Sequence, residues 1–172
     1  GNIKNNSKVI LDYAHTPAAL ESALINLKDQ FPNSKLSLVF GCGGNRDVQK
    51  RSLMGGIAEK YSDEIYLTDD NPRNEKPHRI RKDIKKGIKK AYVNEIPNRK
   101  KAIKLAIKNL KTGDLLLVAG KGHEKTQEYR GKKNFFSDKK IILKFIKLKN
   151  RSLSKNLKLN IIKEFSKYEI SN

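Results

Sequence analysis

The segment Thr68–Glu75 groups side chains that can bind a small charged molecule. It contains Asp69 and Asp70, an amide, a proline and an arginine, which is more polar chemistry than a turn needs. An arginine can hold a carboxylate with two parallel hydrogen bonds, and an aspartate can accept from an ammonium group. The segment therefore predicts a site for a zwitterion, with Arg73 on its carboxylate and an acid on its ammonium.

A second polar segment, Gly120–Glu124, directly follows the apolar run Leu115–Ala119. A short run that is apolar throughout is typical of a central parallel strand buried on both faces. A solvated loop could hold the same polar residues. Because two further polar segments follow other strands, however, four polar loops at four strand ends predict one shared pocket.

The third segment, Asp12–Pro17, follows the apolar residues of Lys8–Leu11. Thr16 suits a helix N-cap and Pro17 suits the first helical position, so part of this segment is explained by the start of a helix. Capping does not explain Asp12 or His15. The residues alone leave open whether these two belong to a site or to the local fold.

The fourth segment, Gly41–Asp47, contains three glycines at a predicted turn from strand to helix. Glycines let the backbone approach a ligand, and a helix start favours anions, although a tight turn would use the same residues. The segment is neither a dinucleotide fingerprint nor a GxxxxGK[ST] phosphate loop, and the latter is absent from the whole chain. Arg46 suits a carboxylate or phosphate, whereas Cys42 is expected to be buried rather than nucleophilic.

The elements that position these segments follow from hydrophobic periodicity. Apolar runs alternate with stretches of helical spacing, and a Gly131 turn indicates a hairpin. This alternation predicts an α/β fold: a Rossmann-like, doubly wound, mostly parallel sheet with helices on both faces, whose ligands lie at the carboxyl ends of the strands. The predicted strands are 8–11, 36–40, 64–67, 92–96 and 115–119, the hairpin is 127–136, and the helices are 16–30, 48–61, 78–91, 99–110 and 139–148.

Composition narrows the class of protein. The 172 residues carry a formal net charge of +20, which excludes an acidic solvating protein and raises phosphorylated ligands, anionic lipid or nucleic acid as partners. Aromatic residues make up 7% and there is no tryptophan, so a stacking platform for nucleic acid is not expected. One cysteine, no membrane-spanning run and no signal peptide predict a cytoplasmic protein without membrane contact. The lysine-rich helices are interpreted as solvated faces.

The ends of the chain suggest its organisation. The first residue is Gly1 rather than Met, so we expect the chain to be part of a longer protein. After Asn150 the composition shifts to Lys, Asn and Ser with scattered Leu and Ile. We therefore predict one domain over residues 1–150 and a basic tail over residues 151–172, which could form one more surface helix.

Together, the four segments resemble the C-terminal domain of the Mur ligases over roughly residues 8–149. The Asp70–Arg73 run is similar to that of the members that add meso-diaminopimelate rather than lysine. The resemblance implies an ATP-dependent amide-bond ligase of peptidoglycan synthesis, with ATP and Mg²⁺ as cofactors. In this family ATP phosphorylates the D-glutamate carboxylate of UDP-N-acetylmuramoyl-L-alanyl-D-glutamate, and the amine of the incoming amino acid attacks the acyl phosphate.

The resemblance also implies roles for individual residues. A buried Arg73, with Asn71, would hold the distal carboxylate of meso-diaminopimelate, and Glu124 with the Gly120 carbonyl would hold its distal ammonium. The full set implied for the amino acid is Arg46, Asp70, Asn71, Pro72, Arg73, Gly120 and Glu124, and Asp12 and His15 are implied to lie near the nucleotide. No catalytic residue or metal ligand is expected within this chain, which should be inactive without its own N-terminal and central ATPase domains.

Three alternatives remain beside this expectation. A binding module could retain the fold and pocket without catalysis. A lysine-adding ligase would share most of the motifs, but Arg73 argues against it. A basic nucleic-acid-associated protein would explain the charge alone, and its binding would be non-specific and sensitive to salt.

Overall fold

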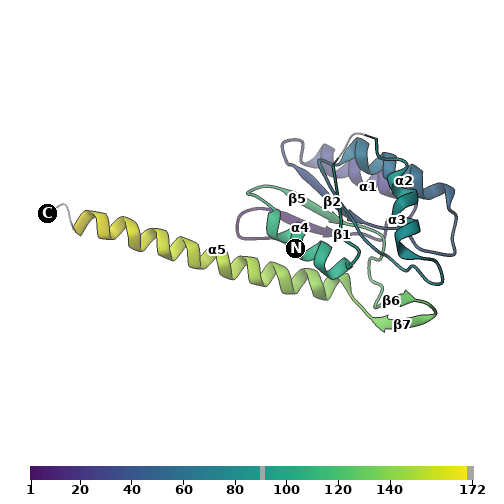
Figure 1. Ribbon diagram of the computed structural model, residues 1–172. Helices are drawn as coiled ribbons and strands as arrows, with labels where there is room; N and C mark the ends of the chain where they lie inside the picture. The colour runs from purple at the N-terminus through teal and green to yellow at the C-terminus, as the bar shows by residue number, and fades with distance from the viewer. Residues whose placement is uncertain (90–91, 170–172) are drawn as a thin grey trace.

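The computed structural model describes residues 1–89 and 92–169, with side chains described as far as residue 159. A parallel sheet lies at the centre, helices cover both of its faces, and a long helix extends away from the body (Figure 1). In chain order the elements are β1 (Lys8–Leu11), α1 (Pro17–Gln30), β2 (Leu36–Phe40), α2 (Gln49–Tyr61), β3 (Glu64–Leu67), α3 (Pro77–Lys85), β4 (Val93–Glu95), α4 (Arg99–Asn109), β5 (Leu115–Val118), β6 (Thr126–Tyr129), β7 (Lys132–Phe135) and α5 (Asp138–Glu169).

The sheet has the strand order β1-β5-β2-β3-β4, and each neighbouring pair is parallel. β5 lies between β1 and β2, so the last strand of the sheet inserts between the first two. All five strands therefore end at one edge, where the loops after β1, β2, β3 and β5 meet. The predicted α/β class with a doubly wound parallel sheet is confirmed.

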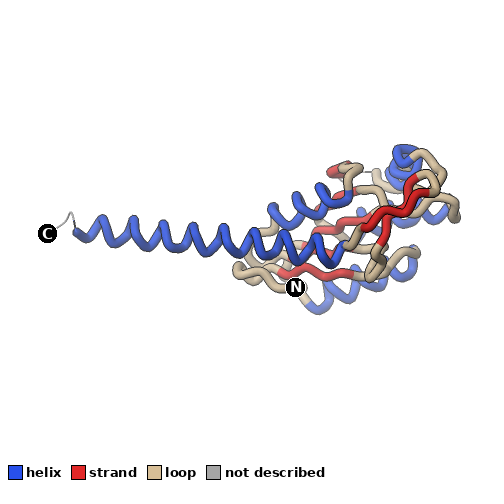
Figure 2. Tube along the Cα trace, turned by 90° about the horizontal axis from the view of Figure 1, so that it is seen from below, coloured by secondary structure: helices blue, strands red, loops and turns tan. Residues whose placement is uncertain are grey.

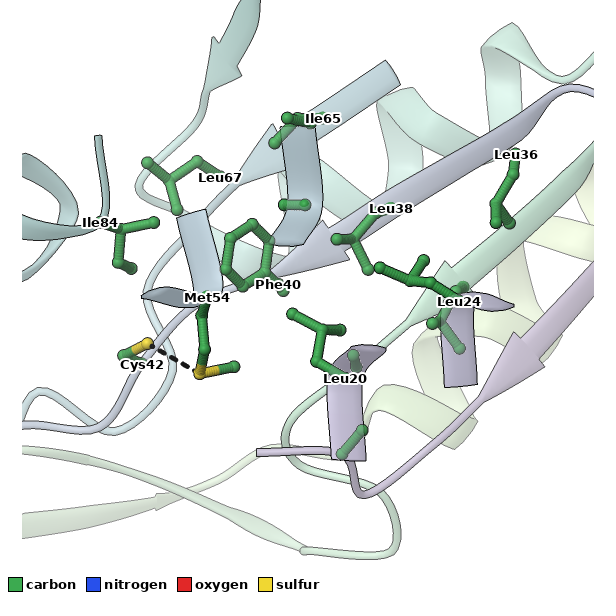
Figure 3. Packing of buried hydrophobic residues seen from close by; sticks show 14 of the residues in the cluster. Leu20, Leu24, Leu36, Leu38, Phe40, Cys42, Met54, Ile65, Leu67 and Ile84 are labelled. Atoms are coloured by element: carbon green, nitrogen blue, oxygen red, sulfur yellow. Dashed lines mark hydrogen bonds between the residues drawn. The ribbon is translucent and has the colours of Figure 1, made fainter. Parts of the chain in front are cut away.

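Successive side chains of a strand point to opposite faces of the sheet, and this divides the core into two clusters. Leu36, Leu38 and Phe40 of β2 face one side, where they pack with α1, α2 and α3 (Figure 3), and Val39 faces the other, where α4 and α5 pack. Both faces of β2 and β5 are buried. This double burial explains why β5 is apolar throughout and β2 is apolar except for Ser37, rather than alternating with polar residues.

Most predicted element boundaries are confirmed to within a residue or two. The backbone N–H of Ala19 donates to Thr16 Oγ1 at 3.3 Å, so Thr16 is the N-cap of α1, with Pro17 at its first position. The hairpin of β6 and β7 turns at Arg130 and Gly131, both at positive φ. The lysines of α3 and α4 are exposed, as expected for solvated faces.

The third predicted helix is shorter than expected, because α3 ends at Lys85. The backbone N–H groups of Gly87 and Ile88 donate to carbonyls three residues earlier, which tightens the chain into turns. Helical spacing alone does not detect this change, because the apolar Ile88 still falls on the expected face. Residues 90 and 91, which the prediction included, lie outside the described residues.

The last helix is longer than expected. α5 continues through residue 150 without a break, and its second half extends beyond the body in both views (Figures 1 and 2). The predicted tail is therefore helical as far as residue 169, although not as a separate helix. The composition shift after Asn150 introduces no glycine or proline, so nothing in the sequence interrupts the helix. The domain boundary at residue 150 stays a prediction.

Among the helices of residues 1–89 and 92–169, none has the length and apolar character needed to cross a membrane.

Candidate functional site

A cleft of about 240 Å³ lies at the carboxyl edge of the sheet, where the four polar segments meet. It is lined by Tyr13, His15, Thr16, Gly41, Cys42, Gly43, Arg46, Lys50, Asp70, Asn71, Arg73, Gly120 and Glu124. The four segments are distant in sequence, and parallel topology brings them together. The shared pocket predicted from four polar loops at strand ends is therefore present.

Two of the predicted site residues do not line the cleft. Pro72 is buried, and its carbonyl accepts from the backbone N–H of Glu75 at 3.1 Å. Asp12 accepts the backbone N–H of Ala14 through Oδ1 at 2.7 Å, and its carbonyl accepts from Gly120 N–H at 3.2 Å. Asp12 thus shapes the turn after β1, next to the cleft. The other seven predicted residues line it.

One end of the cleft is acidic and contains a buried lysine. Lys121 Nζ lies 2.9 Å from both Asn71 Oδ1 and Glu124 Oε2, and Asn71 Nδ2 donates to Glu124 Oε2 at 2.9 Å. The same ammonium is 4.0 Å from Asp70 Oδ1. The Lys121 side chain is completely buried, and sequence reasoning assigned it no role. Its place inside the Gly120–Glu124 motif was the one available signal.

Burial raises the pKa of Asp70 and of Glu124, and Lys121 lowers both pKa values, but the net shift differs between the two acids. Burial raises the pKa of Asp70, and the charges of Arg99 and Lys121 only partly offset the effect. For Glu124 burial also acts upward, but hydrogen bonds from Lys121 and Asn71 outweigh it and hold the pKa below its usual value. Glu124 is therefore the acid of this end that the structure keeps most firmly ionised.

The other end of the cleft is basic, formed by Arg46, Lys50 and Arg73. Arg73 Nη1 donates to the carbonyl of Gly44 at 2.7 Å, and Arg73 Nε is 3.8 Å from Glu128 Oε2. Its side chain is 25% exposed, so the expectation of a buried Arg73 was wrong. Arg46 is exposed and makes no hydrogen bond or ion pair within the described part of the chain, which leaves its guanidinium available.

The β6–β7 hairpin fixes the loop that carries Asp70, Asn71 and Arg73. Gln127 Nε2 donates to the carbonyls of Asp69 and Asp70, at 3.3 Å and 2.7 Å. The backbone N–H of Glu128 donates to Asn71 Oδ1 at 3.1 Å, and Arg73 N–H donates to the Glu128 carbonyl at 3.1 Å. The loop is thus held by the hairpin as an extra strand would be. The sequence indicated the hairpin but not this contact.

A buried arginine on α2 supports the same loop from the other side. Arg51 Nη2 is 2.8 Å from Glu75 Oε1, and Arg51 Nη1 is 3.2 Å from Asp83 Oδ2 on α3. Its side chain is only 1% exposed. Sequence reasoning did not identify Arg51, because a charged residue in a predicted amphipathic helix is normally solvated.

The glycine-rich turn is explained mainly by contact between two loops. A Cβ on Gly44 would lie 1.9 Å from the carbonyl oxygen of Pro72, and one on Gly41 would lie 2.1 Å from that of Thr68. Neither glycine has a positive φ, so the requirement is for space rather than for backbone freedom. Close packing of this turn against the Asp70–Arg73 loop thus sets the width of the cleft.

Cys42 is buried behind this turn, where its Sγ lies 3.6 Å from Met54 Sδ (Figure 3). Burial raises the pKa of its thiol to about 12. The thiolate that a nucleophile requires is therefore absent at neutral pH, as expected from the sequence.

The cleft can hold a zwitterion, but the described residues include no cluster of His, Cys, Asp and Glu that could bind a metal ion. The turn after β1 has two side-chain atoms that could contact a nucleotide. Asp12 retains Oδ2 after bonding Ala14, and His15 uses Nδ1 on the carbonyl of Tyr13 at 2.8 Å, which leaves Nε2 available.

The fold and this arrangement of loops place the chain in a known class: it belongs to the Mur ligase family. The family described as "Mur ligase, glutamate ligase domain" matches residues 2–122.

The similar proteins narrow the class further. The chain is 56% identical over 145 residues to UDP-N-acetylmuramoyl-L-alanyl-D-glutamate--2,6-diaminopimelate ligase of Rickettsia montanensis, covering 84% of this chain and 30% of the relative. It is 51% identical over 150 residues to the enzyme of the same name from Buchnera aphidicola, covering 87% and 30%. A solved structure of an enzyme of this name matches with a TM-score of 0.78 at 41% identity, covering 83% of this chain and 29% of that one. The chain thus spans about 30% of the length of these relatives.

Proposed function

We propose that this chain is the amino-acid-binding domain of an ATP-dependent ligase that adds meso-diaminopimelate to UDP-N-acetylmuramoyl-L-alanyl-D-glutamate. The observation that carries the proposal is that one cleft has both an acidic end, at Glu124, and a basic end, at Arg73. Relatives that are more than half identical to this chain are named for that reaction. The proposed amino-acid-binding domain comprises residues 1–150. The remaining two thirds of such an enzyme would supply its other domains.

The cleft suits the non-reacting end of meso-diaminopimelate, which carries one carboxylate and one ammonium. Arg73 and the free N–H of Asn71 Nδ2 would hold the distal carboxylate. Glu124 Oε1 and the Gly120 carbonyl would hold the distal ammonium, with Asp70 adding negative charge. Arg46 would take the second carboxylate, so that the proximal amine points out of the cleft toward an acyl phosphate. Pro72 contributes by fixing the loop rather than by contact.

This assignment explains selection against lysine, which lacks the distal carboxylate. Lysine would leave Arg73 and Asn71 without that partner in a partly desolvated position. Leaving such donors unpaired costs about 1–3 kcal/mol, or roughly 5-fold to 150-fold in discrimination. The Gly44 carbonyl and Glu128 already hold Arg73 in position, so it is oriented before the amino acid binds.

Nucleotide chemistry is assigned mainly to the rest of the longer enzyme. ATP, with Mg²⁺, would supply the phosphoryl group that activates the D-glutamate carboxylate. This chain lacks a phosphate loop, and its described residues lack a metal cluster, so its own contribution is limited to Asp12 Oδ2 and His15 on the nucleotide side of the cleft. The domain binds and orients the amine, and its closure excludes water from the acyl phosphate. The proposed location is the cytoplasm, where ATP and the UDP-linked precursor are available.

The test is ligation by the full-length parent protein, given UDP-N-acetylmuramoyl-L-alanyl-D-glutamate and ATP, with meso-diaminopimelate and L-lysine in parallel. Tripeptide formed with meso-diaminopimelate alone is the expected result. Product with lysine alone would contradict the proposed chemistry of the cleft. No product with either, from a folded protein, would favour a binding module without catalysis.

A further inference from the structure

The buried ammonium of Lys121 lies in the acidic end of the cleft but has so far been given no role in binding the amino acid. Its side chain is completely buried, and its Nζ touches three residues of the acidic end. A buried lysine loses much hydration energy, so an unpaired one is rare. Here the charge is paired, and each partner is a residue assigned above to the amino acid.

The first consequence concerns the orientation of Asn71. Its Oδ1 accepts from both Lys121 Nζ and the backbone N–H of Glu128. A flipped amide would place Nδ2 against two donors, so the flipped form is excluded. Asn71 must therefore direct its Nδ2 toward Glu124, with one N–H used there and the other available for a carboxylate in the cleft.

The second consequence concerns Glu124. Its Oε2 accepts from both Lys121 and Asn71, whereas Oε1 makes no hydrogen bond with any described residue. The carboxylate is thus held at one oxygen and free at the other. A ligand ammonium would meet an acceptor that is already oriented, which lowers the entropy cost of binding.

The third consequence concerns charge. Asp70 and Glu124 carry two negative charges when ionised, and Lys121 neutralises one of them. The neighbouring Arg99 and Asp138 neutralise each other. With both acids ionised, the acidic end carries one net negative charge, which matches a ligand with one distal ammonium.

From these contacts we infer that Lys121 is a positioning residue of the amino-acid subsite, which orients Asn71 and Glu124 and sets the charge of the acidic end. The inference rests on the proposed function for the identity of the ligand. It does not make Lys121 a catalytic residue, because the role assigned to Lys121 is exerted through Asn71 and Glu124.

The kinetic test uses the full-length parent ligase carrying Lys121→Met, Lys121→Gln or Lys121→Arg. Losing a charge-assisted pair is expected to raise KM for meso-diaminopimelate about 10-fold to 100-fold in Lys121→Met, with KM for ATP within about 3-fold. Lys121→Gln can still donate a hydrogen bond, so its KM for meso-diaminopimelate should lie between those of the wild type and Lys121→Met. Lys121→Arg keeps the positive charge and should recover part of the lost affinity. The control is Lys125→Met, an exposed lysine of the same loop.

The variants also predict a pH dependence. The charged groups that face Asp70 and Glu124 are Lys121, Arg73, Arg99 and Asp138. Without Lys121 the two carboxylates repel and share a proton, so their pKa values rise. In Lys121→Met, KM for meso-diaminopimelate should therefore fall as pH rises from about 6 to about 8.5, and the wild-type enzyme should show less change.

A measurement on the 172-residue chain separates this inference from the proposed function. NMR titration of the Glu124 carboxyl should give a higher pKa in Lys121→Met than in the wild type, whether or not the parent ligates meso-diaminopimelate. If Lys121→Met does not fold, the same comparison with Lys121→Gln decides. An unchanged pKa of Glu124, or equal rises of KM for both substrates in the active parent, would overturn the inference.

Discussion

Arg99 and Asp138 form a completely buried ion pair, with 2.7 Å between Arg99 Nη2 and Asp138 Oδ2. The same Nη2 donates to the carbonyl of Ala119 at 2.9 Å. The pair joins the first residues of α4 and α5 to Ala119, which lies between the end of β5 and Gly120. The segment that carries Gly120 into the lining of the cleft is thus tied to α4 and α5.

Breaking this pair is expected to destabilise the fold. Asp138→Ala would leave a buried guanidinium without its partner and should lower the free energy of unfolding by about 3–5 kcal/mol. Urea denaturation measures the change. Lys28→Ala, which removes an exposed pair with Asp63 at 3.5 Å, is the control and should cost less than about 1 kcal/mol. A loss in Asp138→Ala as small as the control's would contradict the structural role.

Gly44→Ala is expected to displace the Asp70–Arg73 loop. The added Cβ would overlap the Pro72 carbonyl, so one of the two loops must move. We expect a stability loss of about 1–3 kcal/mol, together with amide shifts at Asn71 and Arg73 in NMR spectra. Gly56→Ala on α2, where the new Cβ would meet its neighbour at an ordinary 3.5 Å, is the matched control. Equal behaviour of the two variants would show that the loops are not in close contact.

Arg73→Ala in the parent ligase should affect the amino acid far more than the nucleotide. Loss of the guanidinium removes a charge-assisted contact, so KM for meso-diaminopimelate should rise about 10-fold to 100-fold. KM for ATP should stay within about 3-fold, and the preference over lysine should shrink. Arg79→Ala, an exposed position on α3, controls for the loss of one positive charge. Equal rises in both KM values would contradict the assignment of Arg73.

Acid should destabilise the protein partly through Glu75. A hydrogen bond from Arg51 holds the pKa of Glu75 below its usual value, so the unfolded chain binds its proton more readily than the folded one. This contribution is present above about pH 4.5 and is lost as pH falls through the lower folded pKa. Glu75→Gln should flatten the decline of stability with falling pH in that range. Asp29→Asn, an exposed change on α1, is the charge control, and an equal effect from both would refute the role of Arg51.

Truncation of α5 should reveal where its structural contribution ends. Lys4 bonds to Asn150 through its backbone and to Ser154 through Nζ, both at 2.8 Å, and Leu153 packs on the core. Ending the chain after Lys155 keeps these contacts and should change stability by less than about 0.5 kcal/mol. Ending it after Asn150 should cost about 1–2 kcal/mol, with turnover of the parent ligase nearly intact. Equal losses from the two truncations would contradict this division.

The sequence predicted the sheet because periodicity and apolar runs report burial directly. Leu115–Ala119 is apolar on both faces, and this indicates a central strand before any contact is known. The meeting of the four loops followed from parallel topology. The site was therefore predictable as a set of segments, although not as a set of contacts.

The supporting charges were not predictable, because their burial depends on partners distant in sequence. Arginine and lysine are normally solvated, and Arg51 and Lys121 are buried because partners from other segments pair their charges. These partners include Glu75 and Asp83 for Arg51, and Asn71 and Glu124 for Lys121. The prediction for Arg73 was wrong in the opposite sense, because Arg73 was expected to be buried and lies partly exposed beside Glu128. The end of α3 depends on local turns that helical spacing does not register.

The most direct test of the proposed site is the position of meso-diaminopimelate in a crystal structure of the full-length ligase. The proposal predicts the distal carboxylate within hydrogen-bond distance of the Arg73 guanidinium and Asn71 Nδ2, and the distal ammonium on Glu124. Meso-diaminopimelate bound outside this cleft, or bound within it with its distal carboxylate on Glu124, would contradict the proposal.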